Sequence, residues 1–276
     1  MRILAVVAGL SVANLYYAQP LAAMMAETYH VKSSAIGVTL MLSQVGYALG
    51  MLLLVPLGDG RERRGLMVTT AVAASGSLLL VALAPSYAAL AAASLLLGFA
   101  SSLPQMAVPF AVGLVPAEER GRAIGSVMGG LLTGILLSRT ASGMLASGVG
   151  WRTTFVCAAV AMALTALVLR TALPTQLPAE PLAYRRILAS LVEVVRSEPL
   201  LRRHALVGAL GFGSFSVFWS TLAFHLATLG YGSKVAGLFG AVGVVGIVAA
   251  PIAGRLSTRV QPALLNVFGL LAVVLG

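Results

Sequence analysis

The chain has 276 residues, of which 59% are hydrophobic and only 9% are charged. An ordinary soluble domain carries about 25% charged residues to cover its surface, so this composition excludes that class and indicates a membrane protein. The net charge of +10 would suggest nucleic-acid binding in a soluble protein, but here the arginines fall between apolar runs, which indicates membrane topology and no nucleic-acid partner.

A helix that crosses a bilayer needs about 20 mostly apolar residues. The apolar runs are too long for the strands of a membrane barrel and lack strand alternation, so the sequence predicts an all-α polytopic membrane protein. The first run is also too long for the core of a signal peptide, and we interpret it as a retained helix. The predicted spans are 3–26, 35–58, 66–84, 87–115, 123–147, 153–173, 204–229 and 235–254, and a ninth starts near residue 261.

Lysine and arginine are concentrated on one side of these spans. If the N-terminus is cytoplasmic, every lysine and arginine faces the cytoplasm except Lys32, Arg152 and Lys234, which lie outside, and Arg139, which lies within a span. Cytoplasmic loops carry the excess of positive residues. The sequence therefore predicts a multi-pass protein of the inner membrane with a cytoplasmic N-terminus.

The longest connection, residues 174–203, divides the chain into an N-terminal six-helix half, 1–173, and a partial C-terminal half, 204–276. The connection is proline-rich at first and then has apolar residues at helical spacing, at Leu188, Leu191, Val192 and Val195. This pattern predicts an amphipathic helix on the cytoplasmic surface. Six spans, a basic linker and further spans are the layout of a two-halved transporter.

The loop after the second span reads VPLGDGRERRG. A basic stop signal for topology would account for its charge alone. However, Leu57, Asp59, Arg63 and Arg64 match the G-x-L-x-D-R-x-G-R-R loop of the major facilitator superfamily, which this chain resembles, whereas Val55, Gly60 and Glu62 depart from it. The resemblance implies that Asp59, Arg63 and Arg64 form a charge relay that closes the cytoplasmic side. A partial second copy, GRLSTR at 254–259, fits an internal repeat.

The phrase ANLYYAQP in the first span resembles the sugar- and drug-efflux branch of that superfamily. Its members have two six-helix halves, so we expect this chain to be truncated after about two and a half helices of the second half. The resemblance implies a secondary transporter of a bacterial inner membrane that works by alternating access. Its expected activity is proton-coupled efflux of small organic molecules, and the full-length protein is expected to be a monomer. It implies no enzymatic activity, cofactor or metal. The alternatives are an inactive truncated membrane fragment or a polytopic membrane enzyme.

The fifth span has small residues every four positions, a spacing at which helices pack closely in lipid. It also resembles the antiporter signature G-x8-G-x3-G-P-x-x-G-G. We expect helix packing at Gly125, Gly130, Gly134 and Gly143.

Arg139 stands where that signature has proline. A charge at this depth costs about 2.5–3.5 kcal/mol on insertion scales. Three interpretations are open: Arg139 binds an anionic substrate or takes part in coupling, it locks helices together, or it extends outward to the lipid headgroups.

Other polar and aromatic residues within the spans are few. Each could line a central cavity or form a contact between helices. His225 is a possible proton-coupling group or a structural histidine, since none of the eight acidic residues lies deep in a span. The residues we expect to line the substrate cavity are Asn14, Tyr17, Gln44, Tyr47, Gln105, Arg139 and Trp219.

Overall fold

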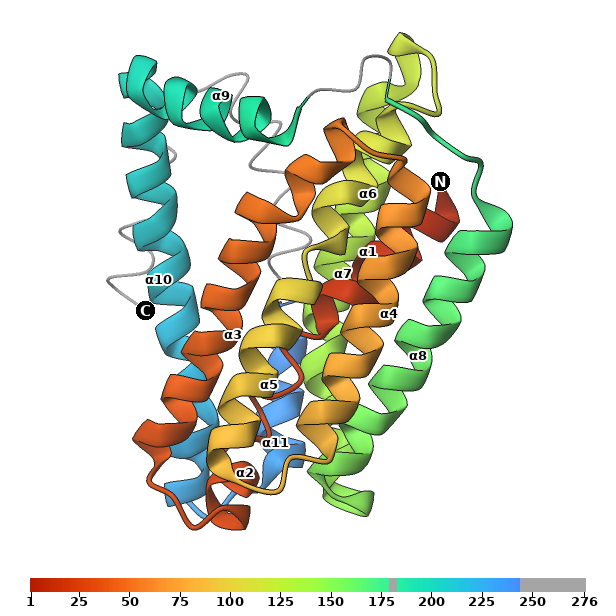
Figure 1. Ribbon diagram of the computed structural model, residues 1–276. Helices are drawn as coiled ribbons and strands as arrows, with labels where there is room; N and C mark the ends of the chain where they lie inside the picture. Colours follow the sequence, from red (N-terminus) through yellow and green to blue (C-terminus); the bar gives the residue numbers. More distant parts are fainter. Residues whose placement is uncertain (179–182, 244–276) are drawn as a thin grey trace.

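The computed structural model describes residues 1–178 and 183–243 as a bundle of roughly parallel helices (Figure 1). Six helical segments are long and apolar enough to cross a membrane by length and composition. The all-α prediction is confirmed for this part of the chain. The ninth predicted span, the motif copy at 254–259 and most of the span predicted at 235–254 lie outside the described residues.

The helices follow the order of the predicted spans. Their bounds are α1 Arg2–Ala13, α2 Ala22–Thr28, α3 Ser33–Leu53, η1 Val55–Asp59, α4 Arg63–Ala82, α5 Tyr87–Ala100, α6 Leu103–Val112, η2 Ala117–Glu119, α7 Arg120–Val149, α8 Trp151–Ala172, α9 Tyr184–Ser197, α10 Pro199–Thr228, α11 Ser233–Leu238 and η3 Phe239–Gly243.

The first span is broken, so the prediction of one helix over 3–26 is wrong. Helix α1 ends at Ala13 and α2 begins at Ala22. Pro20 accounts for the break, because its ring lacks an N–H and would clash with the carbonyl of Tyr16 in a continuous helix. The chain between the helices turns tightly, with the Tyr16 N–H donating to the Ala13 carbonyl at 2.9 Å. The fourth span is divided as well, into α5 and α6, just before Pro104.

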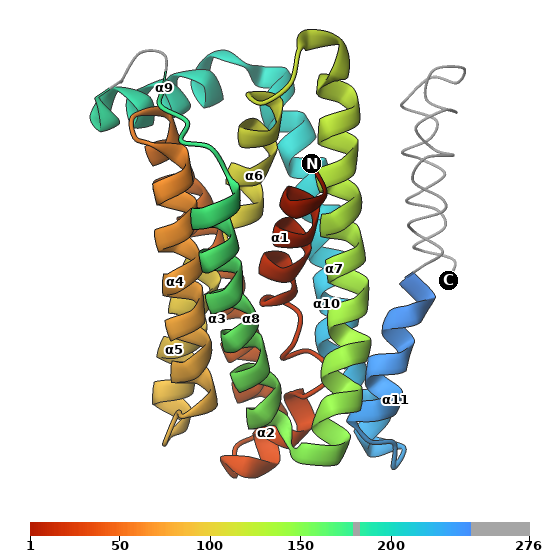
Figure 2. The same ribbon diagram turned by 90° about the vertical axis from the view of Figure 1, so that its right-hand side faces the viewer.

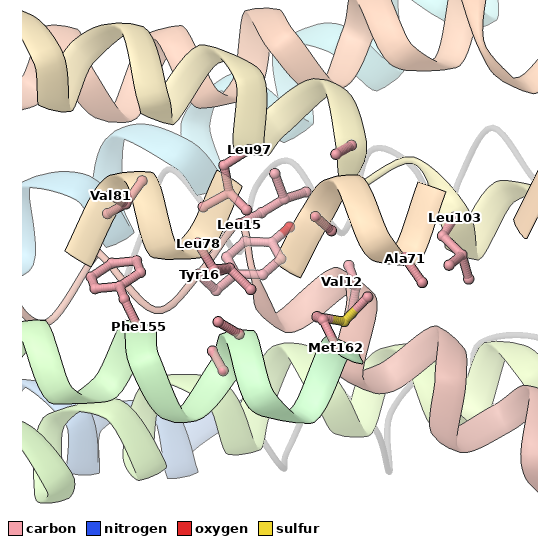
Figure 3. Packing of buried hydrophobic residues seen from close by; sticks show 14 of the residues in the cluster. Val12, Leu15, Tyr16, Ala71, Leu78, Val81, Leu97, Leu103, Phe155 and Met162 are labelled. Carbon is pink, nitrogen blue, oxygen red and sulfur yellow. The ribbon is translucent and has the colours of Figure 1, made fainter. Parts of the chain in front are cut away.

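The first six spans pack as three close pairs, α1 with α7, α3 with α5, and α4 with α8. Small residues make this approach possible. A Cβ atom at Gly98 of α5 would overlap the backbone of Ser43 in α3, and the Ser75 hydroxyl of α4 donates to the Ala159 carbonyl of α8 at 2.8 Å. The pairs share one apolar cluster, of which Figure 3 shows members from several spans.

The predicted amphipathic helix is present as α9, which lies across one end of the bundle (Figures 1 and 2). Tyr184 attaches α9 to the bundle, since its hydroxyl donates to the Leu53 carbonyl at 2.7 Å. We call this end the arginine-rich end, because the turn before α4, the start of α7 and helix α9 lie there (Figure 1) and carry Arg61, Arg120 and Arg185. The other end, where α2 lies, is called the opposite end.

Helix α10 approaches the first six spans at the opposite end. Its buried residues, Ala223 and Leu226, lie in its last two turns, and it contacts α2, α3 and α11. Toward the arginine-rich end its side chains are exposed, Leu210 by 64% and Leu206 by 62%. The two parts of the chain are therefore in contact at the opposite end.

Candidate substrate site

Arg139 is held inside the protein by two hydrogen bonds. Its Nε donates to the Gln19 side-chain oxygen at 2.8 Å, and its Nη1 donates to the Ile135 carbonyl at 2.9 Å. The side chain is 2% exposed and is among the largest fully buried side chains. Arg139 does not extend to the headgroups, so that interpretation is wrong.

Three aromatic rings surround the Arg139 guanidinium, and we call them the aromatic cage: Tyr16, Phe215 and Trp219. The guanidinium carbon lies 4.5 Å from the ring centroid of Tyr16, 5.4 Å from that of Phe215 and 4.2 Å from that of Trp219. A cation over a desolvated ring gains about 2 kcal/mol. Tyr16 comes from the broken first span and the other two rings from α10, so this cage joins the two parts of the chain.

Within the described part of the chain, the positive charge of Arg139 has no carboxylate partner. The one ion pair among the described residues joins Arg63 to Asp59. A guanidinium has five N–H donors, and Gln19 and Ile135 each accept from one of them. The Nη2 atom is buried and has no hydrogen-bond partner among residues 1–178 and 183–243. The two N–H groups of Nη2 can therefore donate to a further acceptor.

The other residues predicted to line the cavity divide into groups. Gln105 of α6 and Tyr47 of α3 lie together, since the Gln105 amide donates to the Tyr47 hydroxyl at 2.9 Å. Gln44 is half-buried on α3, nearly one turn before Tyr47. Tyr17 lines an apolar pocket of about 390 Å³ between α1 and α7.

Asn14 lies inside the first six-span bundle and not at the aromatic cage. It is 2% exposed and lines a very small internal cavity with Thr39 and Ser43 of α3 and Phe155 of α8. Both polar atoms of its side-chain amide are buried and have no hydrogen-bond partner in the described structure. The end of α1 at Ala13 directs Asn14 into this interior.

The loop after α3 has a different set of contacts from the one that the family resemblance implies. Arg63 pairs with Asp59 at 3.3 Å, but Arg64 donates instead to the Leu173 carbonyl at 3.1 Å, beyond the end of α8. Glu62, which departs from the family pattern, caps α4 by accepting from the N–H groups of Arg64 and Gly65 at 2.8 and 2.6 Å. The loop thus joins α4 to the end of α8.

The packing glycines of α7 face two different partners. Gly130 and Gly134 lie against the backbone of α1, while Gly143 lies against Ser233 and Gly237 of α11. The Thr140 hydroxyl also donates to the Gly237 carbonyl at 3.0 Å. Gly125 is exposed, and a Cβ atom there would meet nothing within 4 Å. Helix α7 therefore contacts the second part of the chain as well as the first.

Three residues that contact Arg139 were not selected by the sequence analysis: Tyr16 and Phe215 of the aromatic cage, and Gln19, which accepts a hydrogen bond from Arg139. The signals were present, because Tyr16 and Gln19 lie close to Pro20 in the broken first span, and Phe215 is four residues from Trp219 on the same helical face. His225 is exposed near the end of α10, away from these rings along the helix.

The fold and the buried site define a polytopic helical membrane protein, and comparison with known proteins gives its family. The model of the Major Facilitator Superfamily matches residues 3–276. The chain therefore belongs to this family of transporters.

Relatives and a solved structure agree with this assignment. The chain is 40% identical over 276 residues to YgaY, a putative uncharacterized transporter of Escherichia coli, covering 99% of this chain and 70% of that protein. It is 30% identical over 196 residues to a chloramphenicol efflux pump of Mycobacterium tuberculosis, covering 70% of this chain and 47% of the pump. A bacterial homolog of the human lysosomal transporter Spinster, crystallised inward-facing and unoccupied, superposes with a TM-score of 0.78 at 16% identity, covering 95% of this chain and 62% of that structure.

Proposed function

We propose that the chain is a secondary active transporter that exports small organic molecules across a bacterial inner membrane in exchange for protons. The observation that carries this proposal is the position of Arg139, a buried charge enclosed by rings from both parts of the chain. Substrate sites of two-halved transporters lie near the bilayer midplane between the halves. Efflux is supported by the relative named as a chloramphenicol efflux pump.

The contacts between the two parts of the chain support transport by alternating access. We assign residues 1–173 and 204–276 as the two moving bodies and 174–203 as their linker. The bodies are in contact at the opposite end, and α10 is exposed toward the arginine-rich end. If the arginine-rich end is cytoplasmic, this is an inward-open state. Asp59 and Arg63 would then contribute to closing the cytoplasmic side in the alternate state, and Arg64 would act through its bond to Leu173.

The proposed orientation predicts opposite labelling from the two sides of the membrane. Cys157 is the single cysteine, so a Cys157→Ser background allows single-cysteine probes. We expect Glu118→Cys to react with a membrane-impermeant maleimide only in everted vesicles, and Lys32→Cys only from outside. Both positions are exposed, at opposite ends of the bundle. The reverse pattern would place the N-terminus outside.

The proposed activity predicts proton-driven accumulation in everted membrane vesicles. Export from the cell corresponds to uptake in such vesicles, and chloramphenicol is the probe. We expect vesicles with the full chain to accumulate it above vesicles without the chain, and a protonophore to remove the difference. His225→Asn should abolish the effect of the gradient while leaving exchange of labelled for unlabelled chloramphenicol intact. Accumulation that persists after the gradient is collapsed would reject proton coupling.

A further inference from the structure

We propose that Arg139 binds the carboxylate of a monoanionic organic acid with an aromatic body. This inference rests on the proposed function in one respect: it takes the bound acid to be the transported substrate. Binding itself is a property of the site and can be tested without transport.

The first step of the argument is charge. Arg139 is buried and its Nη2 atom lacks a hydrogen-bond partner. The acidic residues of the described chain lie outside the long membrane-spanning helices, near the ends of the bundle or on α9: Glu27, Asp59, Glu62, Glu118, Glu119, Glu193 and Glu198. The charge is therefore not neutralised by a carboxylate within the membrane part of the described structure. A carboxylate is the acceptor that best matches a guanidinium.

The second step is orientation. Gln19 holds Nε and the Ile135 carbonyl holds Nη1, so the plane of the guanidinium is fixed and Nη2 is left free. A group that only locked helices together would have its donors directed at helix acceptors. An unused donor at Nη2, on a guanidinium group whose orientation is already fixed, is a feature of a binding site whose geometry is set before the ligand arrives.

The third step is the surroundings of the charge, which select the ligand. The faces of Tyr16 and Trp219 lie against the guanidinium at 4.5 and 4.2 Å, with Phe215 beside Trp219 at 6.1 Å between centroids. Rings of this kind favour an aromatic or apolar body by stacking. One unpaired positive charge among apolar groups matches one negative charge, so a monoanion fits better than a dianion.

In the state described here the cage is closed over Arg139, so an entering acid must displace a ring. Trp219 and Phe215 belong to α10, whose side chains are exposed toward the arginine-rich end, and these two rings can move with the second part of the chain. Binding should therefore change the surroundings of Trp219. Since the chain has only two tryptophans, this change can be read from intrinsic fluorescence.

The test compares benzoate with benzamide on the purified full chain in detergent. The two probes have the same ring and nearly the same shape, but only benzoate carries a charge. We expect a saturable fluorescence change with benzoate and binding of benzamide that is at least about tenfold weaker, because a charge-assisted hydrogen bond is lost. Trp219→Phe should remove the signal, which identifies its source. Equal binding of the two probes, or binding of neither, would overturn the proposal.

Two arginine variants and one matched control sharpen the test. Arg139→Gln should abolish benzoate binding. Arg139→Lys should weaken it, because an ammonium group lacks the planar set of N–H donors with which a guanidinium binds a carboxylate. The control is Arg152→Gln, since Arg152 also lies over aromatic rings, at 4.4 Å from Trp151, but is exposed at the opposite end. It should bind benzoate normally. Unchanged benzoate binding in Arg139→Gln would show that Arg139 serves only to hold helices together.

The outcomes separate this inference from the proposed function. Proton-driven accumulation of chloramphenicol without selective benzoate binding would reject the anion site and leave the transporter proposal standing. Selective benzoate binding without transport of benzoate or chloramphenicol in everted vesicles would support the anion site and reject the transporter proposal.

Discussion

Replacing Gly134 by alanine is expected to destabilise the protein by about 3 kcal/mol, the upper part of the usual range for overpacking. A Cβ atom at Gly134 would overlap the backbone of Gly9 in α1. No side-chain rotation can relieve a clash between two backbones, so α1 and α7 must separate. That displacement would also move Tyr16 and Gln19, which follow α1, away from Arg139.

Gly125→Ala is the matched control, because Gly125 lies in the same helix and belongs to the same sequence signature. A Cβ atom at Gly125 meets nothing within 4 Å, and alanine is favoured over glycine in a helix by up to about 1 kcal/mol. We therefore expect effects of opposite sign. Unfolding in a denaturing-detergent titration, followed by circular dichroism, measures both. Equal stability of the two variants would contradict the close packing of α1 and α7.

Trp219→Ala is expected to shift the protein toward an outward-open state. Trp219 in α10 lies 4.2 Å from the Arg139 guanidinium carbon, and this contact joins the two parts of the chain while the opposite end is closed. Loss of a desolvated cation–π contact, about 2 kcal/mol, corresponds to a change of about thirtyfold in the ratio of closed to open molecules. The structure therefore predicts that, in Trp219→Ala, a reagent added outside reaches residues buried at the opposite end faster than in the unmodified protein.

Labelling of a cysteine at position 223 measures this shift. Ala223 is 4% exposed and lies on α10 near the opposite end. In a Cys157→Ser, Ala223→Cys background, Trp219→Ala should raise the rate of labelling by an impermeant maleimide added outside. Val217→Ala on the same helix is the control, since Val217 is 65% exposed and should leave the rate unchanged. If Trp219→Ala does not accelerate labelling, the cage does not hold the opposite end closed.

The interpretations of Arg139 as a helix lock and as an anion site are compatible in this geometry. Two of its donors connect α7 to Gln19 and to its own preceding turn, and these bonds stabilise the fold without a ligand. The Nη2 atom is not used in this way. A transporter needs both kinds of donor. Some must hold the empty site together, and at least one must remain available to bind the substrate.

The sequence by itself determined the membrane class, the approximate spans, the amphipathic helix and the family loop. These features depend on residues that are close together in the chain, and hydropathy over about 20 residues reports them without knowledge of any neighbour. Asp59 and Arg63 were selected from the resemblance of their loop to the family motif, and they pair across one turn because they are four residues apart. The spans predicted at 3–26 and 87–115 did not include the breaks near Pro20 and Pro104, since proline shows where a helix is disturbed but not where it ends.

The tertiary structure alone decided which way each helix faces. Hydropathy is nearly uniform around these helices, so the sequence could not show that Asn14 points into the six-span bundle or that Arg64 bonds to Leu173. It also could not show that the glycines of α7 divide between α1 and α11. The partners of Arg139 come from residues 16, 19, 215 and 219, far apart in the chain. They meet because close packing at small residues fixes the rotation of each helix about its axis.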